Sequence, residues 1–190
     1  MSDRWSALAM IHRLAATLLF CMGILSQDRE EIEICSREHH CSTSWHPPSP
    51  KPVGRNHGAC GICIDEAGEI VLISNDEQSW DFPAGRPEAD EDWEQTLRRE
   101  VLEEACAVVK DARLLGFTCG RRLESEVPSP VLVRSIWLAQ VGLFDWNPQF
   151  EIQYRRLVPA NHAIRLVLPE FEPIWTRAFF EAGMGQDRRE

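Results

Sequence analysis

The sequence predicts an α/β domain in which helices flank a mixed β-sheet. Short runs rich in Val, Ile, Leu and Trp recur along the chain from residue 57 to residue 158, which is typical of strands. One segment among them, at about 91–105, instead repeats its apolar residues at helical spacing. The expected order of elements, β-β-α-β-β-β-α, suits one sheet with helices on its faces.

Two strands precede the first helix. Residues 57–64 and 69–74 are apolar runs, and the Asp-Glu-Ala-Gly sequence at 65–68 is a good hairpin turn between them. The helix that follows carries an apolar stripe made of Trp93, Leu97, Val101 and Ala105. This stripe predicts that one side of the helix is buried.

Three further strands and two helices are expected after this helix. Residues 112–119 and 131–141 are rich in apolar residues, and 154–158 form a short last strand. A proline precedes the first of the two helices, at about 160–167. A glycine follows the second, at about 169–182.

Residues 1–52 differ in character from the rest, and we expect them to form an N-terminal extension. The extension contains an apolar segment at 14–25, expected to be helical, and a stiff proline-rich linker at 45–52. The globular domain is expected at 53–185 and a short tail at 186–190.

The apolar segment has several interpretations. It is 12 residues long, whereas a helix needs about 20 residues to span a bilayer. A signal-peptide core is one alternative, but no small-x-small cleavage site follows it. A partner-packed helix and a later start codon are the others. We expect a cytoplasmic protein, with export or membrane association as the alternative.

The chain has seven cysteines, an odd number at irregular spacing, which indicates reduced thiols rather than a disulfide framework. Zinc is the alternative, because candidate ligands gather at Cys35, His39, His40 and Cys41. However, the paired C-x-x-C spacing of a zinc ribbon is missing. Cys60 and Cys63 lie in a predicted strand, where residues three apart point to opposite faces.

The net charge of −10 excludes some partners. Residues 85–107 contain eight acidic residues and three arginines, so half of the excess negative charge lies in this one stretch. Such a field repels the backbone of long DNA or RNA, which needs basic surfaces. It suits a site that binds metal before a small anionic substrate enters.

Glu100, Glu103 and Glu104 are the candidate metal ligands. Residues at i, i+3 and i+4 lie within about 100° of arc on a helix, and like charges this close raise one another's pKa. Mg²⁺ neutralises such a cluster and shares its ligand shell with substrate phosphates. A solvated helix face is the alternative, although these glutamates border the apolar stripe.

The same stretch resembles the Nudix box, the signature G-x5-E-x7-R-E-U-x-E-E-x-G-U in which U is apolar. Its fixed positions are matched by Gly85, Glu91, Arg99, Glu100, Glu103 and Glu104, and its apolar positions by Val101 and Ala107. The Trp-x-Phe-Pro-Ala-Gly run at 80–85 is similar to the family's lead-in. The resemblance implies a Nudix-type α/β/α sandwich that hydrolyses a pyrophosphate bond in a nucleoside diphosphate-linked substrate.

The resemblance also implies roles for individual residues. Mg²⁺ or Mn²⁺ would be bound by Glu100, Glu103, Glu104 and the backbone carbonyl of Gly85. Glu103 and Glu104 are also catalytic candidates, and Arg99 would orient a glutamate because its guanidinium keeps its proton. Glu151, in the loop before the last strand, is another candidate general base, with a plain surface carboxylate as the alternative.

Cys106 stands where the Nudix box has its second glycine. That glycine often takes the left-handed conformation after a helix, in which a cysteine costs roughly 1–2 kcal/mol. We expect Cys106 to be a tolerated variant in this conformation, and the alternative is a helix that ends differently. It also leaves room for an alternative function, that of a catalytically weak Nudix-like module that binds a nucleotide for regulation.

The box does not specify the substrate. Aromatic side chains such as Trp137 and Trp146 could stack on a base, although aromatics at strand spacing usually belong to a core. Arg121, Arg122 and Arg134 could contact phosphates. The expected partner is a small nucleotide-type molecule, and a homodimer is left open.

Overall fold

The computed structural model describes residues 31–35, 40–122, 129–148, 150–167 and 171–184. Its strands are β1 Glu31–Cys35, β2 His40–His46, β3 Arg55–Ile64, β4 Ile70–Ser74, β5 Ala84–Gly85, β6 Ala107–Arg122, β7 Leu132–Leu143 and β8 Tyr154–Val158. Its helices are α2 Trp93–Ala105, α3 Ala160–Leu166 and α4 Glu172–Glu181. Within the described residues these strands form one mixed sheet of order β1-β2-β6-β7-β3-β4-β8, and β5 pairs with β3 beside this path.

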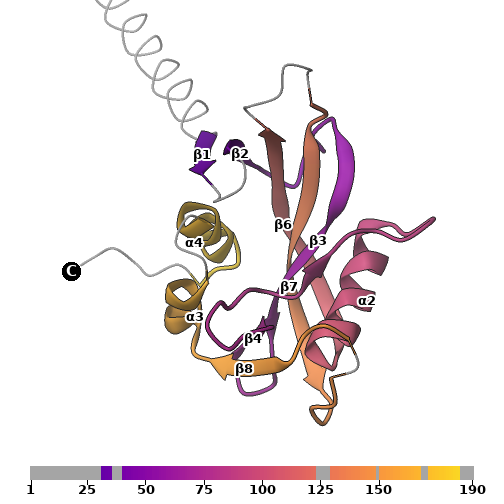
Figure 1. Ribbon diagram of the computed structural model, residues 1–190, viewed down its shortest axis with the longest axis vertical. Helices are drawn as coiled ribbons and strands as arrows, with labels where there is room; N and C mark the ends of the chain where they lie inside the picture. Colours follow the sequence, from indigo (N-terminus) through magenta and orange to yellow (C-terminus); the bar gives the residue numbers. More distant parts are fainter. Residues whose placement is uncertain (1–30, 36–39, 123–128, 149, 168–170, 185–190) are drawn as a thin grey trace, which may run out of the picture. The chain divides into compact units, whose positions relative to one another are not determined.

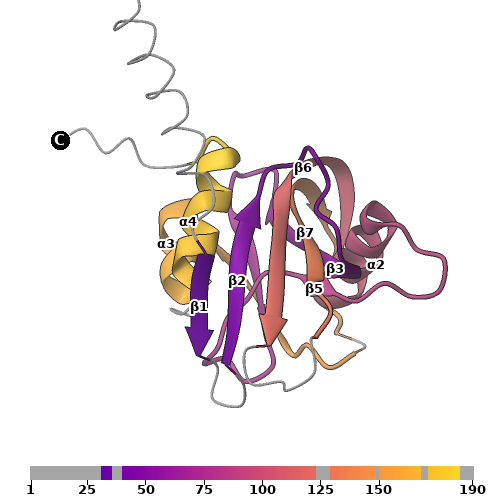
Figure 2. The same cartoon turned by 90° about the horizontal axis from the view of Figure 1, so that it is seen from above.

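The sheet is covered by helices on both faces. Helix α2 lies on one face, and α3 and α4 lie on the other (Figures 1 and 2). The stripe residues Leu97 and Val101 pack in the core beneath α2, whereas Trp175 and Phe179 of α4 pack in a second core. The predicted α/β/α sandwich is confirmed.

Most strands lie where the sequence predicts them. Strand β8 has the predicted bounds, and β4 begins one residue later than predicted. Strand β6 is longer than the predicted 112–119, because its first residues already pair with β7, with Ala107 opposite Leu143. Charged side chains such as Lys110 alternate with buried ones in this part of β6, so it lacks the apolar run that marks the other strands.

The sheet begins before the predicted domain boundary at residue 52. Strand β2 pairs with β6, with Trp45 opposite Thr118, and the Trp45 side chain is only 4% exposed. This corrects the prediction that residues 1–52 are an extension outside the domain. The pairing joins segments about seventy residues apart, and no local pattern reports it. The proline-rich stretch therefore connects two strands of one sheet.

The apolar segment at 14–25 and the predicted tail at 186–190 lie outside the described residues. Of the helices that the structure describes, none is long and apolar enough to cross a membrane.

Candidate active site

Helix α2 begins with a capping box. The Asp92 carboxylate accepts a hydrogen bond from the Gln95 backbone N–H at 2.8 Å, and the Gln95 side-chain oxygen accepts one from the Asp92 N–H at 2.8 Å. These two bonds satisfy donors that the first turn of a helix leaves free. They fix where the helix starts and thereby which side each glutamate faces.

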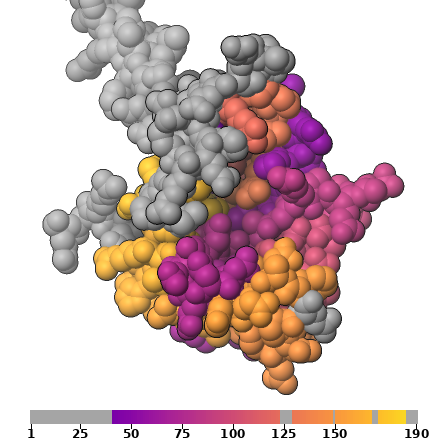
Figure 3. All heavy atoms as spheres, viewed as in Figure 1, coloured from indigo at the N-terminus to yellow at the C-terminus, as the bar shows by residue number. Residues whose placement is uncertain are grey.

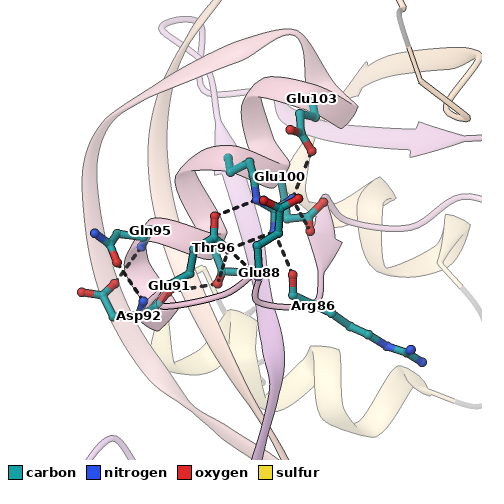
Figure 4. Close-up of polar contacts among 9 residues, drawn as sticks. Arg86, Glu88, Glu91, Asp92, Gln95, Thr96, Glu100 and Glu103 are labelled. Atoms are coloured by element: carbon teal, nitrogen blue, oxygen red, sulfur yellow. Dashed lines mark hydrogen bonds and ion pairs between the residues drawn. The ribbon is translucent and has the colours of Figure 1, made fainter.

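Arg99 is the centre of a polar network on α2. Figure 4 labels its partners Glu91, Glu100 and Glu103. The Arg99 guanidinium donates to both carboxylate oxygens of Glu91, at 2.7 and 3.0 Å. It also donates to Glu100 at 2.9 Å, to Glu103 at 3.0 Å and to the carbonyl oxygen of Arg86 at 2.8 Å. Because one planar guanidinium holds three carboxylates, it determines how they are oriented. The orienting role of Arg99 stays a prediction, and these hydrogen bonds are its physical basis.

Glu91 ties the preceding loop to the helix. Besides Arg99, it accepts hydrogen bonds from the Glu88 backbone N–H at 3.0 Å and the Thr96 hydroxyl at 3.1 Å. The hydrogen bonds from Arg99 are the main reason that the pKa of Glu91 is lowered to about 2. Glu91 is therefore a fixed anion and a structural partner of Arg99. The loop that it anchors stands out from the surface between β5 and α2 (Figure 3).

Glu100 lies against Gly85. The carboxylate is only 8% exposed, and Glu100 is the one buried charged residue among those that the structure describes. A Cβ atom at residue 85 would lie 1.7 Å from Glu100 Oε1, so only glycine fits there. Burial raises the pKa of Glu100, and the nearby Arg99 opposes this change. The box glycine thus makes room for a carboxylate.

Glu104 contacts Ala84, the residue of β5 that precedes Gly85. Its carboxylate accepts a hydrogen bond from the Ala84 N–H at 2.8 Å. Burial raises the pKa of Glu104 to about 7, and the charges of Glu100, Glu151 and Asp81 raise it further, while the Ala84 bond lowers it. A cation beside Glu104 would favour its ionised form. Glu151 is exposed, and among these charges it is the one from the loop before β8.

A cavity of about 360 Å³ adjoins Glu104. Its lining includes Ser74, Asp81, Ala84, Glu104, Arg134 and Ile152. Acidic and basic groups thus face the same space. Arg134 was a phosphate-binding candidate from the sequence, whereas Asp81 was missed. The only sequence signal for Asp81 was its position in the Trp-x-Phe-Pro-Ala-Gly run at 80–85.

The carboxylates do not form a closed metal site in this structure. Among the described residues, no group of three His, Cys, Asp or Glu side chains could hold a metal ion as placed. Glu100 and Glu103 both accept from Arg99, and the Gly85 carbonyl oxygen lies against Gly58. The donor set still suits a hard cation, since it consists of carboxylate and carbonyl oxygens. Glu100 already has the positive charge of Arg99 beside it, whereas Glu104 forms no ion pair with a described residue and its pKa is raised mainly by burial.

The cysteines do not form a metal site among the described residues. Cys60 packs in the core between the sheet and α4, and Cys63 packs in the core between the sheet and α2. The two side chains therefore point to opposite faces of the sheet, as predicted. Burial raises the pKa of both thiols, that of Cys63 to about 12. His39 of the other cysteine cluster lies outside the described residues.

Cys106 takes the left-handed conformation expected from its place in the box, with φ 47° and ψ 53°. Its N–H donates to the Val101 carbonyl, which ends the helix, and its thiol lies 3.5 Å from the Asn147 carbonyl oxygen. The thiol is thus engaged away from the glutamates, at the helix end.

The NUDIX domain family model matches residues 54–172, which contain the sheet core, α2 and the glutamates. This chain belongs to the Nudix hydrolase family. The matched region begins at the start of β3, so β1 and β2 precede it.

Solved Nudix structures share the fold. A mutant of the pyrophosphohydrolase BsRppH from Bacillus subtilis is 24% identical, with 81% of this chain and 98% of that chain covered at a TM-score of 0.60. The ADP-ribose complex of the NUDIX domain of Shewanella oneidensis NrtR is 14% identical, with 71% and 92% covered at 0.51. A MutT protein from Bacillus halodurans is 17% identical, with 65% and 80% covered at 0.52. No curated protein matches the chain in sequence.

Proposed function

We propose that this Nudix protein is a divalent-metal-dependent pyrophosphohydrolase that acts on a nucleoside diphosphate-linked substrate. The observation that carries the proposal is that two glutamates of α2 contact the two residues of β5. Glu100 is buried against Gly85, and Glu104 is half-buried against Ala84. Buried carboxylates are unfavourable unless a partner compensates their charge. A Mg²⁺ or Mn²⁺ ion provides such compensation.

Glu100, Glu103 and Glu104 would hold the ion, with the Gly85 carbonyl as a further ligand. When bound, the metal neutralises phosphate charge and lowers the pKa of coordinated water. Arg99 keeps Glu100 and Glu103 oriented and remains protonated throughout. Its contacts to Glu91 and the Arg86 carbonyl hold the loop in place beside the substrate cavity.

Two carboxylates are candidates for removing a proton from the attacking water. Glu104 lies on the cavity wall among the proposed metal ligands, where a carboxylate could take the proton of a metal-bound water. Glu151 is exposed, and its negative charge contributes to the raised pKa of Glu104. Loss of turnover in Glu151→Gln with intact metal binding would favour Glu151.

The test is hydrolysis of a panel of nucleoside diphosphate derivatives and nucleoside triphosphates, with Mg²⁺ or Mn²⁺ and with excess EDTA. We expect turnover only with metal, and we expect Glu103→Gln to lower kcat by about 10²-fold or more. Glu94→Gln is the matched control, since Glu94 lies on the same helix and pairs only with the exposed Arg98. Turnover that persists in EDTA would falsify the metal assignment.

A regulatory nucleotide-binding module is the second candidate. It is favoured by one observation, that Arg99 occupies carboxylate oxygens of both Glu100 and Glu103. In this case the same panel would give binding of a nucleotide without release of phosphate or nucleoside monophosphate.

The cytoplasmic location and the homodimer remain predictions. Cell fractionation tests the first, and size-exclusion chromatography with light scattering tests the second.

A further inference from the structure

A basic pocket opens beside the carboxylate site. The cavity measures about 270 Å³ and is lined by Arg55, Asn56, His57, Arg86, Pro87 and Leu132. Arg55 and His57 belong to the start of β3, and Arg86 directly follows β5. None of these basic residues belongs to the glutamate network through its side chain.

The backbone under this pocket is closely fitted. The pairing of β3 with β7 shifts register between Asn56 and Gly58, so His57 is an extra residue without a partner on β7. Such bulges re-aim a side chain. The Asn56 side-chain oxygen accepts from the Gly58 N–H at 3.0 Å and also from the Trp93 indole N–H. This fixes the bulge against helix α2.

Gly58 also brings the Arg86 segment onto β3. Its φ is +136°, and a Cβ atom there would lie 1.9 Å from the Gly85 carbonyl oxygen. Only glycine allows this approach. The backbone of the pocket is therefore formed by two chain segments that are held in contact.

Arg55 and Arg86 line the same pocket as His57, and Arg134 lies opposite Gly58 on the neighbouring strand β7. Burial lowers the pKa of His57, and the positive charges of Arg134, Arg86 and Arg55 lower it further. Among the described residues, none of these arginines forms an ion pair, in contrast to Arg99. Figure 4 shows the Arg86 guanidinium pointing away from the glutamate network, to which only its carbonyl contributes.

The unpaired arginines are unusual in a chain with a net charge of −10. Acidic residues are abundant, yet Arg55 and Arg86 line a pocket that contains no acidic side chain. Their mutual repulsion is relieved by a bound anion, and guanidinium forks fit phosphate oxygens in pairs. The pocket therefore has the chemistry of a phosphate site.

Arg134 connects this pocket to the carboxylate cavity. It lines the cavity that also contains Glu104 and Ala84, and it pairs in the sheet with Gly58, the residue that follows His57. Ala84 and Arg86 are two residues apart on the same segment. The 84–86 segment therefore lines both cavities, one through Ala84 and the other through Arg86.

We propose that the pocket of Arg55, His57 and Arg86, joined by Arg134, binds the unblocked terminal phosphates of a nucleoside triphosphate substrate. A nucleoside diphosphate capped by a sugar has no charge to place there. This proposal rests on the proposed function and narrows its substrate class to nucleoside polyphosphates with a free phosphate end.

The first experiment measures binding without turnover. Inorganic tripolyphosphate is titrated calorimetrically into the full-length protein in excess EDTA, so that the metal site is not involved. We expect saturable binding that weakens at least about tenfold in the Arg55→Gln/Arg86→Gln double variant. Arg165→Gln, an exposed arginine of α3 on the opposite face of the sheet, should bind like the wild type. Absence of binding, or equal binding by the double variant, would overturn the proposal.

Folding of the variants is checked by thermal unfolding. Arg55 and Arg86 are both exposed, so we expect their Tm values to match the wild type. If the double variant is less stable, the single Arg86→Gln variant takes its place, with at least a threefold loss of tripolyphosphate affinity expected. An unchanged affinity in that single variant would count against the pocket.

The second experiment compares two substrate classes in Mg²⁺. We expect the double variant to raise KM for nucleoside triphosphates at least about tenfold with little change in kcat, and to leave nucleoside diphosphate sugars unaffected. An equal loss of kcat/KM for both substrate classes would overturn the proposal that the pocket binds the terminal phosphates. If the wild type hydrolyses neither class, the proposed function fails, whereas the tripolyphosphate titration still decides whether the pocket binds phosphate.

Discussion

Arg155 of β8 donates a hydrogen bond to the carbonyl oxygen of Ala105, the last residue of α2, at 2.8 Å. The same guanidinium donates to the Cys106 carbonyl at 3.2 Å and to the Phe144 carbonyl at 3.1 Å. Helix α2 has no basic residue in its own last turn. A distant strand therefore supplies the positive charge that stabilises the end of the helix carrying the glutamates.

Replacement of Arg155 by methionine should destabilise the protein by about 1–2 kcal/mol, because carbonyl groups at the helix end lose their donor. Urea unfolding measures this change, and Arg122→Met, at an exposed position of β6 away from any helix end, serves as the control. A midpoint equal to that of the wild type would show that water replaces Arg155 at no cost.

Gly85→Ala should lower both stability and activity. The new Cβ would lie 1.7 Å from Glu100 Oε1, so the carboxylate or β5 must move. We expect a loss of about 1–3 kcal/mol in unfolding free energy and at least about a tenfold loss in kcat. Gly120→Ala is the control, because its nearest neighbour would be 3.8 Å away. Wild-type activity in Gly85→Ala would mean that Glu100 does not need its present position.

Much of this site was visible in the sequence because its signals are local. The stripe from Trp93 to Ala105 predicts the helix, and the spacing of Arg99 and Glu103 places them side by side. Cys106 was expected in the left-handed region and is found there. In each case the interacting residues lie within a few positions of one another, where helix geometry alone decides their proximity.

The remainder depends on contacts between distant segments. Trp45 pairs opposite Thr118, and Arg155 reaches Ala105 from fifty positions away. The basic pocket joins β3 to the residue after β5 through a bulge at His57. Neither strand pairing across such separations nor the site of a bulge is encoded by composition or periodicity.

Stability should depend on pH through Glu104 when metal is absent. The folded-state pKa is raised to about 7 from a usual 4.5, so its contribution is complete below about pH 4.5 and is lost as pH rises through 7. In EDTA we expect the unfolding free energy to fall by on the order of 2 kcal/mol between pH 5 and pH 8.5 from this group.

Glu104→Gln should remove most of this decline, because glutamine stays neutral at every pH. Glu94→Gln, on the exposed side of α2, should keep the wild-type slope. Mg²⁺ should raise the stability of the wild type most at high pH, where Glu104 is ionised. An unchanged slope in Glu104→Gln would assign the pH dependence to other groups.

Truncation distinguishes the two possible domain starts. Removal of residues 1–30 should leave a folded protein, since residues 31–190 form one compact unit. Removal of residues 1–52 should be strongly destabilising, because it deletes β2 and the buried Trp45, whose loss alone is expected to cost about 3–5 kcal/mol. Thermal unfolding and soluble yield report both results. A stable 53–190 fragment would show that β6 tolerates an open edge.

Cys106→Gly should stabilise the protein. With φ at 47°, the cysteine Cβ is strained by roughly 1–2 kcal/mol, and glycine removes that strain. A freer unfolded chain opposes this gain by about 0.4–1 kcal/mol, so the net stabilisation should be up to about 1 kcal/mol. Thermal unfolding should show a Tm higher by about 2–4 °C.

Because the thiol of Cys106 lies beside the Asn147 carbonyl and contacts none of the glutamates, kcat of Cys106→Gly should change less than tenfold. Cys119→Gly, in ordinary strand conformation, provides the opposite sign as a control, since it adds chain entropy without relieving strain. A large loss of activity in Cys106→Gly with retained stability would show that the thiol takes part in catalysis.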